Sequence, residues 1–186
     1  IRDEFGISYN DIVVCNIGRF VIAKNHEFII EMANEMIKEN SRVKFLLVGD
    51  GELKENIEFN AKKLGIEKNI YFTGIRSDIP NILNNSDLFI LPSIYEGLGL
   101  VLLEAQAAGL PCLVSEAIQP EVDLGIGLIK KINLSKGATA WVNEAKKIIQ
   151  DKSNKNIDVN KAVKEKKYDL NSILEILLGV YKLNLD

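Results

Sequence analysis

Short runs of apolar, largely β-branched residues alternate along this chain with longer stretches in which apolar residues recur every three or four positions. The short runs predict strands buried on both faces, and the longer stretches predict helices with one apolar face. Strands are expected at 12–17, 43–48, 70–72, 88–91, 112–114 and 128–132, and helices at 26–40, 52–64, 78–84, 100–108, 136–149 and 171–183, with Asp78 as an N-cap. Parallel neighbours need crossover connections, so the alternation predicts an α/β fold with a doubly wound, Rossmann-like parallel sheet.

The composition excludes several classes of protein. Of the 186 residues 47% are hydrophobic, which excludes disorder as the main state, and a formal net charge of -3 provides no overall positive field for nucleic acid or an anionic membrane. Any phosphate site must therefore be local. Cys15 and Cys112 each lie in an apolar run, which favours buried free thiols and a reducing compartment over a redox or metal pair.

The two ends of the chain differ from its middle. The chain begins with Ile1 rather than Met, which suggests a piece of a longer protein, and residues 1–10 are interpreted as the remnant of a linker before a single domain. Residues 151–167 are polar and basic, as in a linker or a short surface helix. The last predicted helix places a set of apolar residues on one face: Ile173, Ile176, Leu177, Val180 and Tyr181.

In a doubly wound sheet, ligands bind outside the carboxyl ends of the strands. The loops expected there span residues 18–25, 49–51, 73–76 and 92–99. Arg19 and Lys24 lie near the start of a helix, whose free N–H groups and dipole also favour an anion, and this predicts a diphosphate clamp. The competing interpretation is an ordinary loop with two solvated cations. His26, the single histidine, is expected to be structural or exposed, and without further ligands it gives little support for zinc.

The loop after the fourth predicted strand carries the most specific pattern. Glu96 and Glu104 flank a Gly-x-Gly segment, Gly97 to Gly99, at the start of a helix. Glycines let backbone amides approach a ligand, and carboxylates accept hydrogen bonds from sugar hydroxyls. Because Glu104 lies in a largely apolar helix, it is expected to need a bound partner. The alternative is that Glu96 caps the helix and Glu104 faces solvent.

Taken together, these motifs resemble the nucleotide-binding C-terminal domain of a retaining family 4 glycosyltransferase of the GT-B fold. The resemblance is carried by Gly18 and Arg19 with Lys24, by the segments 48–51 and 72–74, by Glu96 and Glu104, and by the segment 108–111. It covers nearly the whole chain, and the shared order of the motifs makes it more specific than any one of them.

The resemblance implies a role for each residue. Arg19 and Lys24 would hold the donor diphosphate and stabilise its negative charge on departure, and Glu96 would face the transferred sugar, so these three are the expected catalytic residues. The implied donor-binding residues are Gly18, Gly49, Gly51, Ile75, Arg76, Ser93, Gly97, Leu98, Gly99, Leu100 and Glu104. Among these, Glu104 would bind the ribose, and Ile75 with Arg76 would lie against the base. No metal and no other cofactor is implied.

The implied partners are a nucleotide sugar, with UDP as the expected nucleotide, a glycan or lipid-linked acceptor, and an N-terminal acceptor-binding domain that is missing here. By the same resemblance, the C-terminal helix of residues 168–186 would brace that domain. A looser similarity over residues 132–141 suggests capsule or exopolysaccharide synthesis in the cytoplasm, at the inner face of the membrane through the missing domain. The fragment is expected to bind donor without turning it over. Residues 115–121 depart from the glycine-rich segment of many relatives, so a sugar contact there is not expected.

Two alternatives remain open. One is a GT-B relative with other chemistry, such as a nucleotide-sugar epimerase or a phosphorylase-like enzyme, against which the paired Glu96 and Glu104 argue. The other is a flavodoxin-like or receiver-like signalling module. A receiver needs clustered acidic residues after its first strand and an acceptor Asp after its third, whereas this chain has Gly18 and Arg19 at the first position and Thr73 and Gly74 at the second.

Overall fold

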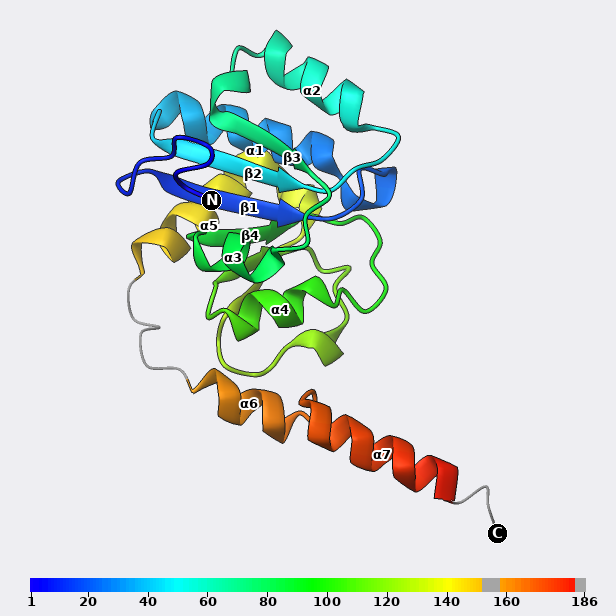
Figure 1. Cartoon of the computed structure of the whole chain (residues 1–186). Helices are drawn as coiled ribbons and strands as arrows, with labels where there is room; N and C mark the ends of the chain where they lie inside the picture. The colour runs from blue at the N-terminus through cyan, green and yellow to red at the C-terminus, as the bar shows by residue number, and fades with distance from the viewer. Residues whose placement is uncertain (152–157, 183–186) are drawn as a thin grey trace.

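The computed structural model describes residues 1–151 and 158–182, and its centre is a six-stranded sheet in which every paired strand is parallel. The strand order is β3-β2-β1-β4-β5-β6 (Figure 1). The strands are β1 (Ile12–Ile17), β2 (Val43–Val48), β3 (Ile70–Gly74), β4 (Leu88–Leu91), β5 (Cys112–Val114) and β6 (Ile129–Lys131). This confirms the doubly wound, Rossmann-like sheet.

One face of the sheet packs against helices α1 (His26–Glu39), α2 (Lys54–Lys63) and α5 (Gly137–Gln150). Val14, Phe45 and Leu47 point into this core and meet Ile29 of α1 and Trp141 of α5, all of them fully buried. The apolar face of each helix follows the spacing that predicted it, since residues three and four positions apart share one side of a helix.

The opposite face packs against helices α3 (Ile79–Asn84) and α4 (Val101–Ala107). Cys15, Leu46 and Phe89 alternate along their strands with residues of the first core, and they meet Leu83 and Leu102 of the helices. Because both faces are covered, the central strands are apolar throughout, which explains their continuous apolar runs. Both cysteines are free and buried, as expected.

The predicted elements agree with the structure to within about two residues at their ends, including the helix expected from residue 52, which begins at Lys54. One local prediction needs correction. Asp78 does occupy the N-cap position of α3, but its carboxylate accepts hydrogen bonds from Arg76 instead of from the helix backbone. Within residues 1–151 and 158–182, four short 3-10 helices were not predicted: η1 (Ile22–Lys24), η2 (Glu67–Asn69), η3 (Pro120–Val122) and η4 (Leu134–Lys136).

Residues 1–8 pack against the domain. Ile7 is buried, and the ring of Phe5 lies 5.3 Å from that of Tyr71, centroid to centroid. Arg2 donates hydrogen bonds to the carbonyl of Ser8 at 2.8 Å and to the carboxylate of Asp87 at 3.3 Å. The interpretation of residues 1–10 as a linker in a longer protein stays a prediction.

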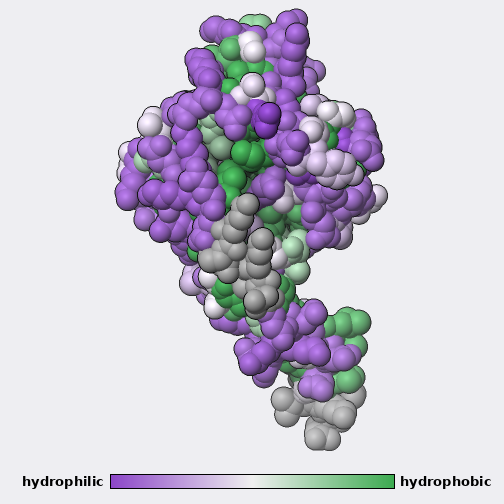
Figure 2. All heavy atoms as spheres, turned by 90° about the vertical axis from the view of Figure 1, so that its left-hand side faces the viewer, coloured by the Kyte–Doolittle hydropathy of each residue, from purple (hydrophilic) through white to green (hydrophobic). Residues whose placement is uncertain are grey.

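Two C-terminal helices, α6 (Val159–Glu165) and α7 (Leu170–Lys182), extend away from the sheet (Figure 1). The Tyr168 hydroxyl donates to the carbonyl of Glu121 at 2.9 Å and Ala162 is buried, so α6 contacts the domain. Figure 2 shows apolar side chains along α7, where the exposed ones are Leu170, Ile173, Leu174, Ile176, Leu177, Leu178 and Val180. The parts of the predictions that fall on residues 152–157 and 183–186, and on the side chain of Tyr181, lie outside the described residues.

None of the helices within the described residues is both long and apolar enough to cross a bilayer.

Candidate functional site

The strand order reverses between β1 and β4, which are neighbours in the middle of the sheet. A crevice forms outside the carboxyl ends of a parallel sheet at such a switch point. A cleft of about 540 Å³ lies beside this switch point, outside the carboxyl ends of β1, β2 and β3. It is lined by Gly18, Arg19, Gly49, Asp50, Gly51, Ile75 and Arg76, with Ile17, Val48 and Ile79. Except for Lys24, the site residues predicted in the first three loops therefore line one cleft.

Two glycines make the floor of this cleft possible. Gly49 has a φ of +132° and Gly51 a φ of +157°. A Cβ added to Gly49 would lie 2.1 Å from the carbonyl oxygen of Gly18, and one added to Gly51 would lie 2.6 Å from that of Phe20. The loop after β2 can approach the loop after β1 this closely only because both residues lack a side chain.

The loop after β1 is pinned by its backbone, which leaves the side chain of Arg19 free. Phe20 is fully buried, its N–H donates to the carbonyl of Asp50 at 2.9 Å, and its own carbonyl accepts from Leu53 N at 3.0 Å. Arg19 is exposed at the cleft and has no ion-pair or hydrogen-bond partner for its guanidinium among the described residues. The cleft thus presents an unpaired cation held on a rigid loop.

Lys24 has a different environment, because its Nζ forms an ion pair with Oε2 of Glu96 from the loop after β4. The side chains are 19% and 10% exposed, so the pair is largely shielded from water. Ser93, itself buried, donates its hydroxyl to the same carboxylate oxygen at 3.2 Å, and Ser115 Oγ donates to the carbonyl of Ser93 at 2.6 Å. Glu96 is therefore fixed by a cation and a hydroxyl and does not cap a helix.

Backbone contacts hold these two loops together. The N–H of Ile94 donates to the carbonyl of Ala23 at 2.8 Å, and the amide of Asn25 donates to the carbonyl of Pro92 at 3.1 Å. Asn25 adopts the left-handed conformation, φ 57°, that an Asn tolerates better than most residues. Sequence reasoning missed Asn25 as the residue that ties the loops.

The Gly-x-Gly segment lies directly beside this ion pair. Gly99 has a φ of +67°, and a Cβ placed on it would come within 3.3 Å of Glu96 Cγ. Gly97 and the side chains of Leu98 and Leu100 are exposed. Their backbone amides precede α4, which begins at Val101.

Glu104 corrects one sequence expectation. Its side chain is exposed and has no hydrogen-bond or ion-pair partner among the described residues, so solvent alone can stabilise the carboxylate and a bound partner is not required. The buried polar residue of α4 is Gln106, which sequence reasoning missed. Gln106 donates to the carbonyls of Leu102 and Val122 at 2.9 and 2.7 Å and accepts from Leu124 N at 2.9 Å.

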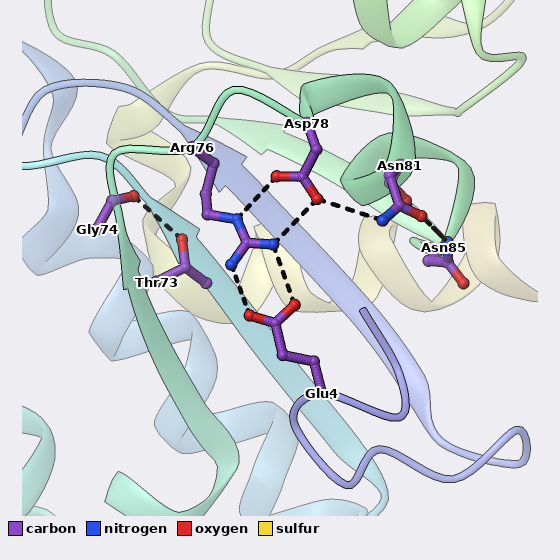
Figure 3. A network of polar contacts seen from close by, with 7 residues as sticks. All are labelled: Glu4, Thr73, Gly74, Arg76, Asp78, Asn81 and Asn85. Carbon is purple, nitrogen blue, oxygen red and sulfur yellow. Dashed lines mark hydrogen bonds and ion pairs between the residues drawn. The ribbon is translucent and has the colours of Figure 1, made fainter.

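Arg76 lies at the far end of the cleft in a network with two carboxylates (Figure 3). It donates to both oxygens of Asp78 and to both oxygens of Glu4. These hydrogen bonds raise the pKa of Arg76 and lower the pKa values of Asp78 and Glu4. Ile75, beside it, is 82% exposed. The role of Glu4 had no signal in the sequence.

His26 lies behind the loop after β1. It is buried, and its ring stacks on that of Phe20 with centroids 4.0 Å apart. Neither ring nitrogen has a hydrogen-bond partner in the part of the chain that the structure describes, and burial, with the nearby charge of Lys24, lowers the pKa of His26 to about 4. This buried, neutral ring fits the structural role expected for it. Among the described residues, no cluster of three or more His, Cys, Asp or Glu side chains is placed to hold a metal ion.

The comparison with protein families decides what kind of chain this is. The family model described as glycosyl transferases group 1 matches residues 1–166. The chain belongs to the group 1 glycosyl transferases. The expectation of a glycosyltransferase domain of the GT-B fold is thereby confirmed.

Two curated proteins are similar in sequence to this group 1 glycosyl transferase chain. Over 179 residues it is 31% identical to EpsF of Bacillus subtilis (strain 168), a protein provisionally named as a glycosyltransferase. The match covers 96% of this chain and 47% of EpsF. The chain is 42% identical over 113 residues to the UDP-Gal:alpha-D-GlcNAc-diphosphoundecaprenol alpha-1,3-galactosyltransferase of Escherichia coli, covering 59% of this chain and 29% of that enzyme. The chain thus spans about half the length, or less, of these relatives.

Among solved structures, Anabaena HepE in complex with UDP-glucose is similar to this chain, with a TM-score of 0.78 and 22% sequence identity. The match covers 100% of this chain and 51% of HepE. At this level of identity the likeness shows the shared fold.

Proposed function

We propose that this chain is the donor-binding, C-terminal domain of a retaining family 4 glycosyltransferase that takes its sugar from a UDP-sugar. The observation that carries the proposal is the ion pair between Lys24 and Glu96 at the switch point, beside the unpaired Arg19 and a glycine-floored cleft. Fixed cations next to a shielded carboxylate suit a substrate with a diphosphate at one end and sugar hydroxyls at the other.

The residues divide the donor between them. Arg19 and Lys24 bind the diphosphate and stabilise the charge it gains when its bond to the sugar carbon breaks. Glu96, held by Ser93 and Lys24, faces the sugar. Glu104, unpartnered among the described residues, accepts from the ribose hydroxyls, and the exposed Ile75 lies against the base. The remaining donor contacts come from Gly18, Gly49, Gly51, Arg76 and the backbone of Gly97, Leu98, Gly99 and Leu100.

The rest of the reaction needs groups that the described residues do not supply. An N-terminal domain would bind the acceptor, a glycan or a lipid-linked sugar whose hydroxyl oxygen bonds to the sugar carbon and releases its proton. The name of the Escherichia coli relative, which gives a UDP-sugar donor and a diphosphoundecaprenol-linked acceptor, supports this choice. We place the reaction in capsule or exopolysaccharide synthesis on the cytoplasmic side of the membrane, without a metal.

Calorimetric titration of the 186-residue chain with UDP, GDP and ADP, with and without magnesium, tests the proposal. Binding of UDP with a Kd between about 1 μM and 1 mM is expected, independent of magnesium. Lys24→Ala should abolish or weaken it, while Lys62→Ala, on the exposed side of α2, should leave it unchanged. Absence of binding by all three nucleotides, or equal binding by Lys24→Ala and the wild type, would overturn the proposal.

A further inference from the structure

Glu4, near the start of the chain, holds the guanidinium of Arg76 at the wall of the cleft (Figure 3). Arg76 Nη1 donates to Oε1 of Glu4 at 2.6 Å, and Nη2 donates to Oε2 at 3.0 Å. On the adjacent edge, Nε and Nη2 donate to the two carboxylate oxygens of Asp78 at 2.8 and 3.0 Å. Both contacts are bidentate, so two carboxylates from distant parts of the chain fix the guanidinium plane.

This arrangement leaves Arg76 without positive charge to offer a ligand. One guanidinium between two carboxylates gives a local net charge of about -1. At the other end of the same cleft, Arg19 is exposed and has no ion-pair partner among the described residues. The two ends therefore differ in charge: a phosphate group is favoured at Arg19, and an uncharged planar group is favoured at Ile75 and Arg76.

Glu4 is presented by a packed segment and not by a free tail. Residues 1–8, called the N-terminal strap below, are anchored by Arg2 on Asp87, by the Phe5 ring on Tyr71, and by the buried side chain of Ile7. Exposed ion pairs contribute little when both side chains are free to move. Here the strap fixes one partner, and the side chain of Arg76 is only 22% exposed.

We propose that Glu4 is a positioning residue for the nucleotide: by neutralising Arg76 and holding it flat against the wall, it makes this end of the cleft take the base and the Arg19 end take the diphosphate. The inference rests on the proposed function, because it assumes that the cleft binds a nucleoside diphosphate. It adds a residue of the strap, outside the loops that line the cleft, to the determinants of how the donor lies.

The test compares Glu4→Gln with Asp3→Asn, which removes the same charge from a neighbouring strap residue whose side chain is exposed and unpartnered among the described residues. Each variant and the wild type is titrated with UDP and with inorganic pyrophosphate. In Glu4→Gln we expect the Kd for UDP to rise about fivefold, while the Kd for pyrophosphate stays equal or falls, because the local net charge at Arg76 changes from about -1 to about 0. Asp3→Asn should leave both constants unchanged.

A second readout, which needs no ligand, is the rate at which the Arg76 Nε–H proton exchanges with water, measured from its NMR cross-peak. The hydrogen bond to Asp78 protects this proton from exchange. We expect faster exchange in Glu4→Gln and wild-type exchange in Asp3→Asn. If the wild type binds UDP but the ratio of the two Kd values is the same in both variants, the positioning role is overturned and the proposed function stands. If the wild type binds neither probe, the proposed function fails, and unchanged Arg76 exchange would overturn the positioning role as well.

Discussion

Lys24 and Glu96 lie 72 positions apart in the chain and form an ion pair where the loops after β1 and β4 meet. The pair joins the residue expected to bind the diphosphate to the residue expected to face the sugar. Each neutralises the other in a site shielded from water. The two roles can therefore be separated by changing one partner at a time.

Lys24→Ala should raise the Kd for UDP by about 10- to 100-fold, the loss expected when a charge-assisted contact is removed. Glu96→Gln keeps the shape of the side chain and releases Lys24, so UDP affinity should stay within about twofold or increase while the preference for UDP-sugars over UDP is lost. Calorimetry with UDP and a panel of UDP-sugars measures both. A Glu96→Gln variant that loses UDP as strongly as Lys24→Ala would contradict this division.

Helix α4 allows a contrast between binding and stability within one turn. Gln106→Ala leaves the buried carbonyl of Val122 and the N–H of Leu124 without their partner, and should lower the free energy of unfolding by about 2–3 kcal/mol. Glu104→Ala, at an exposed and unpartnered position, should change stability by less than about 0.5 kcal/mol but weaken UDP binding. Urea unfolding measures the stability of both variants, and calorimetry measures their affinity for UDP. Equal UDP affinity in Glu104→Ala and the wild type would exclude its ribose role.

Gly51→Ala should damage the cleft floor, because the new methyl group would meet the backbone of Phe20 at 2.6 Å. We expect a loss of about 3 kcal/mol in the free energy of unfolding and a loss of nucleotide binding. Gly97→Ala is the matched control for stability alone, since a Cβ there meets nothing within 4 Å and its φ is not in the left-handed range. If Gly51→Ala unfolds at the same urea concentration as the wild type, the close approach does not constrain the loop.

Most of the fold could be predicted from the sequence because strands buried on both faces leave continuous apolar runs, as at β1 and β2. The orientation of Glu104 could not. Glu104 and Gln106 are two positions apart, so they point to nearly opposite sides of α4, and packing against residues 122–124 decides which one is buried.

The ion-pair partners of the site residues could not be predicted from the sequence either. The ion pair between Lys24 and Glu96, and the contact of Glu4 with Arg76, each join residues 72 positions apart. Such contacts depend on the order of the strands, which alternation alone does not give. The residue types at the cleft were predictable because carboxyl ends of parallel strands share one edge of the sheet.

His26 should make stability depend on pH. Burial and the nearby charge of Lys24 lower its pKa to about 4 in the folded chain from an ordinary value of 6.5, so the unfolded chain binds the proton more tightly. The free energy of unfolding is therefore highest above pH 6.5, falls as the pH drops, and loses about 2 kcal/mol between about pH 7 and pH 5 from this residue.

His26→Phe is the matched variant, because it keeps an aromatic ring against Phe20 and the ring nitrogens have no partner to lose. His26 is the single histidine of the chain, so this loss should disappear in the variant. Urea unfolding of both proteins at the two pH values measures it. The same loss of stability in His26→Phe would assign the pH dependence to other groups.

Helix α7 should make the 186-residue chain self-associate. Its exposed side chains include Leu174 and Leu177, each 46% exposed, and a helix that is apolar on most sides is stabilised by burying that surface. Leu174→Glu combined with Leu177→Glu should shift the chain toward monomer in sedimentation equilibrium, whereas Asn171→Glu, which adds a charge to a polar exposed position of the same helix, should not. Strictly monomeric sedimentation of the wild type at high concentration would contradict the prediction. An added N-terminal domain should suppress the self-association if that domain is what covers α7.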